Sequence, residues 1–509
     1  MTNSHFLNIG SGDSLKSLLQ DTVKKEKQCL LFVNSKRSAE KEAEEAAKFL
    51  GIRSAELEEL SKKILVVLGH PTTQCERLSI CVKGGTAFHH SGLHKKQREI
   101  IEDAFRNGLI KVISCTPTLA AGVDLPAYRS IIRDMKRYGR NGMEYIPVLE
   151  YLQISGRAGR PSYDKEGESI IIANTETEKE ILIEKFIKGK PEEILSKLAV
   201  EPVLRTYALS LVASHVVRNA DEIKEFFAKT FWAHQYKDTK HLYKIIEKVL
   251  EILEKEKFIS TTKESIEATP LGRTVSQLYI DPLTAVHFIN CLTKTKEKIT
   301  PIALLHATNT TPEARPLLTV TIKEYEELTE QSERIEEELI AEIPTMFDEE
   351  YEEHLKAVKT TMMLIDWISE VTEEEILEKY KSRPGETRTR IQTLDWLLYA
   401  LGELARVQGK HKIVLETQKL RTRLEYGARE ELLPLLELKG IGRIRARILY
   451  RNGIKNIGAV KRTSYETITQ LIGPALAKSV KEQVESPVEK ISERKRKGQL
   501  GLGKWEDDD

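Results

Sequence analysis

Residues 110–126 read IKVISCTPTLAAGVDLP, and they decide the fold of the first part of the chain. Residues 110–115 are mostly apolar and rich in β-branched side chains, which predicts a buried strand. Hydroxyl side chains, a glycine and a carboxylate follow this strand directly. Because open α/β sheets bind ligands at the carboxyl ends of their strands, the loop is a candidate binding loop. An ordinary strand-to-helix connection is the alternative.

Strand-like and helix-like segments alternate around this stretch, from residue 1 to about residue 196. Further short apolar runs predict strands at 28–34, 86–88 and 169–173. Amphipathic patterns predict helices at 38–50 and 95–107. Alternation of this kind predicts a parallel α/β sheet.

After about residue 196 helical patterns dominate, with long acidic helices expected at 323–342 and 348–370. A strand-like stretch at 258–269 follows two helical segments, which predicts a winged helix. We expect five parts in order: an α/β domain over 1–196, a winged helix over 197–283, a helical domain over 284–420, short helices separated by glycines over 421–486, and a flexible tail over 487–509.

Composition excludes several classes of protein. Lys and Arg total 79 against 78 for Asp and Glu, so any basic surface for nucleic acid must be local. The five cysteines form no CxxC pair, which predicts reduced thiols, a cytoplasmic location and no metal site. No apolar run approaches ~18 residues, so we expect no membrane span. The first residues lack the apolar core of a signal peptide.

Residues 153–160 read QISGRAGR. If this run is helical, Gln153, Arg157 and Arg160 are spaced i, i+4, i+7 and share one face. Two fixed guanidinium groups on one face can bind phosphate oxygens bidentately. A surface helix with solvated arginines is the alternative.

Residues 88–93 read FHHSGL and are expected to connect a strand to a helix. The histidine pair suggests a metal, but no third ligand lies nearby in the sequence. Contact of His90, Ser91 and the local backbone N–H groups with a phosphate is the preferred interpretation. A purely structural turn is the alternative.

These strings, in this order and preceded by the strand at 30–37, resemble motifs IV, IVa, V and VI of the second RecA-like domain of superfamily 2 helicases. The resemblance is to archaeal Ski2-like DNA helicases of the Hjm type, which are linked to stalled forks and branched DNA. It continues through YIDPLT at 279–284, DWI at 366–368 and GIGRIRAR at 440–447, and covers about residues 28–484.

The resemblance implies roles for individual residues. Arg160 matches the arginine finger, Arg157 its companion on the nucleotide, and Gln153 the residue that couples the nucleotide to DNA. Gly122 and Asp124 match nucleotide-side positions, and Thr116 and Thr118 match positions near the DNA backbone. The implied mechanism is closure of two RecA-like domains around ATP and Mg²⁺, with the finger stabilising the transferring phosphoryl group.

Residues 131–147 predict a β-hairpin. Asn141-Gly142 is a strong hairpin signal because both turn positions need a positive φ, and basic and aromatic residues flank the turn. In the resembled family a hairpin here separates the strands, and Tyr138 or Tyr145 is the candidate for stacking on the last base pair. A plain surface hairpin is the alternative.

The helical stretch at 386–404 resembles the family's ratchet helix, which crosses under the translocating strand. Arg388 and Trp396 are its candidate DNA contacts, by phosphate binding and base stacking. Thr389 stands where the family's arginine is expected, seven positions before Trp396. The alternative for Trp396 is a core position beside Leu397 and Leu398.

Residues 438–442 (LKGIG) followed by three arginines resemble a helix-hairpin-helix, and 471–474 (LIGP) predicts a second hairpin. Glycine allows backbone N–H groups to meet a phosphate at a helix start. The candidate DNA-binding residues are Gly440, Gly442, Arg443 and Arg445. Such contacts predict sequence-independent, salt-sensitive binding. A simple helical turn is the alternative.

The chain contains no GK[ST] string to end a phosphate loop and no acidic Mg²⁺ motif at a strand end. The expectation is therefore that the first RecA-like domain is absent from this polypeptide. Taken with this absence, the resemblance implies the C-terminal part of an ATP-dependent 3′–5′ DNA helicase acting on forked or branched DNA in repair and replication restart. Alone, the chain is expected to bind DNA without robust ATP hydrolysis. A non-catalytic DNA-binding scaffold and part of an RNA helicase are the alternatives.

The expected partners are single-stranded and forked DNA and a separate first motor domain, with the chain itself a monomer. In the tail, Gln499, Leu502 and Trp505 loosely resemble a sliding-clamp-binding peptide, although Glu506 stands where a second aromatic is expected.

Overall fold

A computed structural model describes residues 13–68, 70–120, 123–139, 142–159, 164, 166–198, 200–237, 239–262, 265–295 and 299–485 of the chain. The chain forms two units. One contains residues up to 366 together with 371–418, and the other contains 367–370 together with the residues from 419 onward. Arg160, Gly122 and the tail peptide with Gln499, Leu502 and Trp505 lie outside the described residues.

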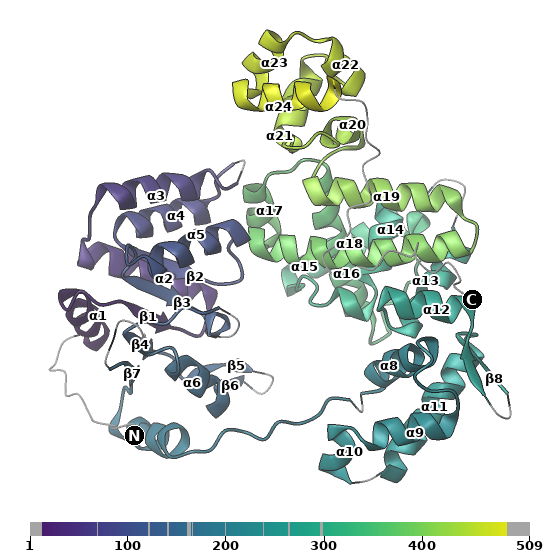
Figure 1. Cartoon of the computed structure of the whole chain (residues 1–509), viewed down its shortest axis with the longest axis horizontal. Helices are drawn as coiled ribbons and strands as arrows, with labels where there is room; N and C mark the ends of the chain where they lie inside the picture. Colours follow the sequence, from purple (N-terminus) through teal and green to yellow (C-terminus); the bar gives the residue numbers. More distant parts are fainter. Residues whose placement is uncertain are drawn as a thin grey trace, which may run out of the picture. The chain divides into compact units, whose positions relative to one another are not determined.

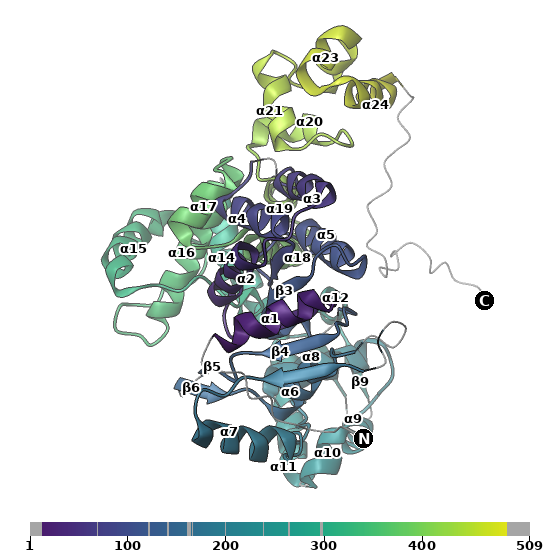
Figure 2. The ribbon, with the colours of Figure 1, turned by 90° about the vertical axis from the view of Figure 1, so that its left-hand side faces the viewer.

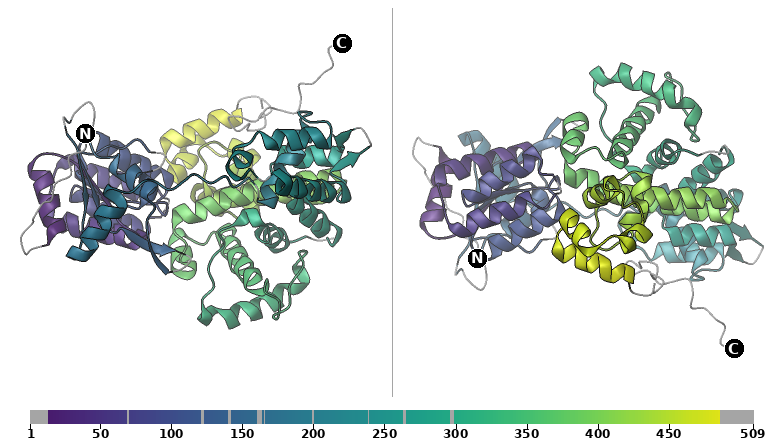
Figure 3. Two further views of the ribbon diagram at one scale, coloured as in Figure 1. Left: turned by 90° about the horizontal axis from the view of Figure 1, so that it is seen from below. Right: turned by 90° about the horizontal axis from the view of Figure 1, so that it is seen from above.

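A five-stranded parallel sheet lies at the centre of the first part of the chain (purple to blue in Figures 1 and 3). Its order is β2-β3-β1-β4-β7, with bounds β1 (Cys29–Phe32), β2 (Thr86–His89), β3 (Val112–Cys115), β4 (Arg129–Ile132) and β7 (Glu168–Ile171). Leu30 of β1 pairs with Ile113 on one side and Ser130 on the other. The central strands are buried along their whole length, which explains their continuous apolar sequences. The predicted parallel α/β sheet is confirmed.

Helices cover both faces of the sheet. They are α1 (Ser14–Lys24), α2 (Lys36–Leu50), α3 (Ala55–Leu65), α4 (Thr73–Lys83), α5 (Lys95–Arg106), α6 (Val148–Ser155) and α7 (Glu176–Leu182), with short helical turns at Pro117–Leu119 and Ile183–Ile187. The helices predicted at 38–50 and 95–107 are confirmed as α2 and α5. The pair α3 and α4 was not predicted, because no strand separates them and the strand-helix rhythm is lost there.

A helical region with a two-stranded ribbon follows. It consists of α8 (Glu201–Ala213), α9 (Ala220–Ala228), α10 (Phe231–Tyr236), α11 (Thr239–Lys255), β8 (Ile259–Thr261), β9 (Ile266–Ala268) and α12 (Pro270–Leu278). The antiparallel ribbon pairs Ile259 with Ala268. The strand-like stretch expected at 258–269 and the winged helix are confirmed.

The next helices are α13 (Pro282–Thr293), α14 (Pro301–Asn309), α15 (Ile322–Ile335), α16 (Tyr351–Ile368), α17 (Glu373–Tyr380), α18 (Pro384–Val407) and α19 (His411–Tyr426), with turns at Pro312–Ala314 and Glu336–Glu338. The helix expected at 323–342 ends early, at Ile335. Glu336, Glu337 and Glu338 follow it, and negative charge is unfavourable at a helix C-terminus.

The second unit has its own apolar core. Its helices beyond α19 are α20 (Leu433–Leu436), α21 (Arg443–Arg451), α22 (Ile457–Arg462), α23 (Tyr465–Ile472) and α24 (Pro474–Glu485), after a turn at Glu430–Leu432. Trp367 joins this unit, because its Nε1 donates a hydrogen bond to the Leu424 carbonyl (2.8 Å). Across the described residues, none of the helices combines the length and apolar character needed to cross a membrane. All five cysteines are buried free thiols.

Candidate nucleotide and DNA interface

The loop after β3 leaves the carboxyl end of the sheet, as predicted. The hydroxyl groups of Thr116 and Thr118 hydrogen-bond to each other (2.9 Å) across the turn Pro117–Leu119. Thr116 is buried, whereas Thr118 is exposed. The carboxylate of Asp124 is almost fully exposed, at 97%. Of the two loop threonines, only Thr118 is therefore open to a ligand.

Residues 153–159 do not form one helix, so the condition for a shared helical face of Gln153 and Arg157 is not met. Helix α6 ends at Ser155, and Gly156 caps it. The chain then pairs with residue 127: Ala127 N donates to Arg157 O (2.9 Å), and Gly159 N donates to Ala127 O (2.7 Å). Gly159 has a φ of +90°, which a side chain would disfavour and which turns the chain into this pairing. Gln153 remains on the exposed face of α6.

This pairing brings Arg157 to the loop after β3. Its Nη2 donates to the carbonyl of Ala120 (2.5 Å), and its Nη1 lies 3.7 Å from Asp124 Oδ1. The side chain is 20% exposed, whereas Asp124 is solvated, so the ion pair is weak and easily exchanged for another anion. Two separate sequence motifs thus meet at the carboxyl edge of the sheet. Arg157 is the described group that fits a nucleotide phosphate.

The described residues contain no group of three or more His, Cys, Asp or Glu side chains that could hold a metal ion. Nothing in the described part of the chain therefore assigns a ligand to Mg²⁺.

The loop after β2 has a different role from the one expected for His90. The His90 ring is fully buried and stacks on Phe88. Its Nδ1 accepts a hydrogen bond from Gly92 N (3.1 Å), so Nε2 carries the proton and donates to Glu40 Oε1 (3.2 Å). Burial lowers the pKa of His90, which favours this neutral form. The geometry therefore argues against contact of the His90 side chain with DNA, while the neighbouring Ser91 is exposed.

The hairpin is shorter than the range 131–147 suggested. Ile131 and Ile132 belong to the central strand β4, and the hairpin consists of β5 (Lys136–Gly139) and β6 (Gly142–Tyr145), which extends beyond the sheet (Figure 2). The Tyr145 ring packs edge-on against Phe186, with Lys136 Nζ 4.6 Å from the ring centroid. Tyr145 is thus held at the base of the hairpin.

The outer part of the hairpin carries a candidate that sequence reasoning missed. Met143 lies opposite Tyr138 in the register and is 55% exposed. The side chain of Tyr138 lies outside the described residues. Methionine can act as an apolar wedge between base steps, so a Met directly after the Asn141-Gly142 pair was a usable sequence signal.

Trp396 on α18 is partly buried, and its Nε1 donates to the carbonyl of Leu278 (2.9 Å). This bond joins α18 to the end of α12. It supports the interpretation that the indole N–H of Trp396 has a structural role in the protein interior. Arg388 is half-buried, and Arg390 is held by a hydrogen bond from Nη1 to Ser382 Oγ (3.2 Å). Tyr279, directly after Leu278, is 76% exposed.

We expect Trp396→Phe to lower the free energy of unfolding by about 1 kcal/mol, because one hydrogen bond to a buried carbonyl is lost. The aromatic ring remains, so the affinity for single-stranded DNA should stay within about twofold. Denaturant unfolding and fluorescence anisotropy measure the two quantities. Weaker DNA binding at unchanged stability would instead favour a DNA contact by the indole N–H.

The glycine-rich segment before α21 forms a turn that connects α20 to α21. Gly440 has a φ of +88°, and Gly442 is the N-cap residue of α21. Arg445 is exposed, with Nη1 donating to the Gly440 carbonyl (3.2 Å). The guanidinium of Arg443 lies 4.4 Å from the Trp367 ring centroid, which gives this arginine a packing contact within the unit.

Arg447, the third arginine of the run, is held by Glu370 and Glu431. The hydrogen bond to Glu370 raises its pKa. Its role is therefore structural, which leaves Arg445 as the described arginine of the run that is open to DNA. Gly473, in the segment where a second hairpin is predicted, has a φ of +85° and lies between α23 and α24.

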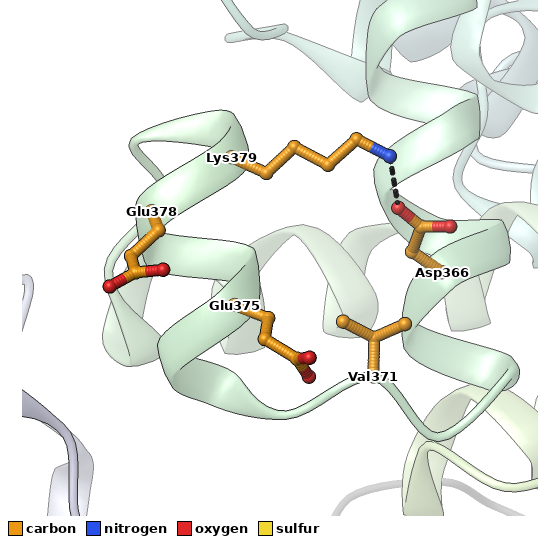
Figure 4. Close-up of a pocket in the computed structure, with 5 residues that line it drawn as sticks. All are labelled: Asp366, Val371, Glu375, Glu378 and Lys379. Atoms are coloured by element: carbon orange, nitrogen blue, oxygen red, sulfur yellow. Dashed lines mark hydrogen bonds and ion pairs between the residues drawn. The ribbon is translucent and has the colours of Figure 1, made fainter.

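A surface pocket near the end of α16 does not suit an anionic ligand. Asp366, Val371, Glu375, Glu378 and Lys379 line it (Figure 4). Lys379 Nζ is paired with Asp366 (2.8 Å), and the other charged groups are carboxylates. A phosphate would be repelled here.

Three family models match the chain in order. The helicase conserved C-terminal domain matches residues 11–162, a helix-turn-helix domain matches 167–260, and domain 4 of archaeal helicases matches 302–427. Together with the parallel sheet and the arginine at its carboxyl edge, these matches define a helicase.

Curated relatives align over almost the whole chain. The ATP-dependent DNA helicase Hel308 of Pyrococcus abyssi is 39% identical over 494 residues, which cover 96% of this chain and 68% of that protein. The Pyrococcus horikoshii protein of the same name is 38% identical with the same coverage. The Methanocella arvoryzae protein is 39% identical over 95% of this chain and 66% of its own length. The chain belongs to the Hel308 family of archaeal DNA helicases.

Proposed function

We propose that this chain forms the second RecA-like motor domain and the DNA-handling region of an ATP-dependent 3′–5′ helicase for forked or branched DNA, acting in repair and replication restart. The observation that supports it most is the meeting of Arg157 with the loop after β3 through the Ala127–Ala158 bridge. This places a partly exposed guanidinium where parallel sheets bind ligands.

In this proposal Arg157 and Arg160 contact the triphosphate, with Arg160 as the finger. Gly122 and Asp124 border the nucleotide, and Gln153 relays its state. ATP supplies the transferring phosphoryl group. The printed residues hold no GK[ST] string, so in this proposal the phosphate loop and the Mg²⁺ ligands come from a first RecA-like domain.

Within the first unit, the DNA strand is proposed to pass Thr118 and Ser91 and then Arg388 and Trp396 on α18. The hairpin before α21, in the second unit, is proposed as a separate DNA contact. The N–H groups at the start of α21 and the exposed Arg445 can bind a phosphate there. The tail peptide with Trp505 is proposed to bind a sliding clamp.

The purified chain tests this proposal. We expect it to bind single-stranded and forked DNA without sequence preference, with the logarithm of the binding constant falling linearly with the logarithm of salt concentration. Arg445→Ala should weaken binding, whereas Arg334→Ala on acidic α15 should not. ATP turnover should be negligible alone, and should become DNA-stimulated once a first RecA-like domain is added.

Each alternative predicts a different result. Turnover by the chain alone that is lost in Arg160→Ala would refute the need for another domain. DNA binding with no turnover even after the domain is added would favour a non-catalytic scaffold. Equal competition by single-stranded RNA would favour an RNA helicase. The relatives are named as DNA helicases, which supports DNA.

A further inference from the structure

The first turn of α18 lies directly against the loop 89–93. Gly385 N donates a hydrogen bond to the carbonyl of Gly92 (3.0 Å). A Cβ atom on Gly385 would lie less than 3.0 Å from the carbonyl oxygens of Ser91 and Leu93, a separation that real Cβ atoms do not show. Glycine is therefore required at this position for the two backbones to touch.

Glu40 of α2 holds both sides of this contact. Its Oε1 accepts hydrogen bonds from His90 Nε2 (3.2 Å) in the loop and from Arg383 Nε (3.4 Å), the N-cap residue of α18. Gln74 Nε2 (2.8 Å) and Arg77 Nη1 (2.5 Å) complete its partners. The side chain is only 3% exposed.

Glu40 is ionised in this setting. Burial alone would raise the pKa of the carboxyl, but the hydrogen bonds from His90 and Gln74 and the charge of Arg383 lower it to about 2. A buried carboxylate that loses one of its partners is strongly destabilised. The two sides are therefore expected to stay together rather than slide.

Two further contacts flank this centre. Lys36 at the start of α2 pairs with Glu386 in the first turn of α18, and Glu386 also accepts a hydrogen bond from Arg383 N (3.0 Å). The second contact joins the start of α4 to α17, where Thr73 N donates a hydrogen bond to the Glu374 carboxylate (2.9 Å). Contacts at three places oppose both rotation and separation of the RecA-like domain relative to α17 and α18.

We propose that the Gly92–Gly385 contact with its Glu40 network is a fixed joint that carries each movement of the RecA-like domain to α18. Glu40 and Arg383 are its positioning residues, and His90 acts through Glu40. The joint keeps exposed Ser91 at a constant distance from the DNA-facing positions of α18. This role of the joint rests on the proposed strand path. On that path the loop with Ser91 and helix α18 bind the same DNA strand, so the number of nucleotides between them stays constant.

Hydrogen exchange tests the joint itself. The Gly385 amide should be strongly protected in the parent chain, about tenfold or more less protected in Arg383→Ala, and largely restored in the charge-retaining Arg383→Lys. Arg406→Ala, near the other end of α18, is the matched control and should leave protection unchanged. Fast exchange at Gly385 in the parent chain, or equal protection in Arg383→Ala, would overturn the joint.

A length series of oligothymidylates tests what the joint does. Affinity should rise in a step once the oligonucleotide spans both segments, because the second contact becomes intramolecular. In Gly385→Ala and Arg383→Ala this step should shrink about tenfold, while the shortest oligonucleotides bind as to the parent chain. If the step in affinity were unchanged in both variants, the joint would have no role in coupling the loop 89–93 to α18. If oligonucleotides of every length failed to bind, the proposed function would be contradicted. The hydrogen-exchange data would still test whether the Gly92–Gly385 contact is rigid.

Discussion

Unwinding of a forked duplex by the complete motor is expected to fall to background when residues 138–143 are replaced by Gly-Gly, while DNA-stimulated ATP hydrolysis continues. The replacement keeps Lys136 and Tyr145, whose ring packs on Phe186, so the base of the hairpin stays folded. It removes Met143, the exposed apolar side chain opposite Tyr138. Prying apart a base step costs about a few kcal/mol, and without a wedge that cost has no compensation.

Point variants identify the wedge. Met143→Ser and Tyr138→Ala should each slow unwinding in a strand-displacement assay, and the double variant should approach the effect of the replacement. Met346→Ser is the matched control, because Met346 is 59% exposed in the helical domain, far along the sequence from the hairpin. Unwinding at the parent rate by the shortened hairpin would reject the strand-separating role.

Acidification from pH 7.5 to pH 5 is expected to remove about 4 kcal/mol from the free energy of unfolding. The source is a pair of buried histidines, His306 and His354, with Nε2 of the first 3.3 Å from Nδ1 of the second. The hydroxyl of Ser332 forms a hydrogen bond with the other ring nitrogen of His354, Nε2 (2.7 Å). Burial lowers the pKa of His306 to about 3 and that of His354 to about 4.

The direction follows from proton uptake. Because both folded pKa values lie below the ordinary value of 6.5, the unfolded chain binds more protons than the folded chain below that pH. The stabilisation is complete well above pH 6.5 and is lost as the pH falls toward the folded pKa values, about 4 for His354 and about 3 for His306. At pH 5 each histidine contributes a loss of about 2 kcal/mol. His287, whose pKa burial also lowers, adds in the same direction.

Denaturant unfolding at pH 7.5, 6.5 and 5.0 measures the effect. His354→Gln keeps a hydrogen-bonding side chain between Ser332 and His306, and it should reduce the loss by about half. His411→Gln removes an exposed histidine and should change nothing. A free energy of unfolding that stays constant from pH 7.5 to 5 would show that the pair is solvated or already charged.

The sheet and the loop after β3 were predictable because their signals are local. Strands such as Cys29–Phe32 are buried on both faces, so apolar composition alone indicates them. The same signal misassigned Ile131 and Ile132, because apolar content cannot distinguish a central strand from the arm of a hairpin.

The features that were missed depend on residues far apart in the sequence. The end of α6 at Ser155 is set partly by the pairing of Ala127 with residues 157–159, which helical periodicity cannot reveal. The partner of His90 is Glu40, and the partner of Trp396 is a carbonyl on α12. Hydrogen bonds decide whether a polar side chain is available to a ligand, and only the folded chain shows them.

The inclusion of Trp367–Glu370 in the second unit has a practical consequence for anyone who wishes to excise it. A fragment that starts at Lys419 would lose Glu370, which holds Arg447, and the indole beneath Arg443. The reciprocal fragment ending at Gln418 would carry Trp367 with its Leu424 acceptor gone. Neither fragment therefore keeps the contacts that the second unit has in the whole chain. Weak DNA binding by such a fragment would reflect its disrupted fold, and it would not show that the surface lacks a role in DNA binding.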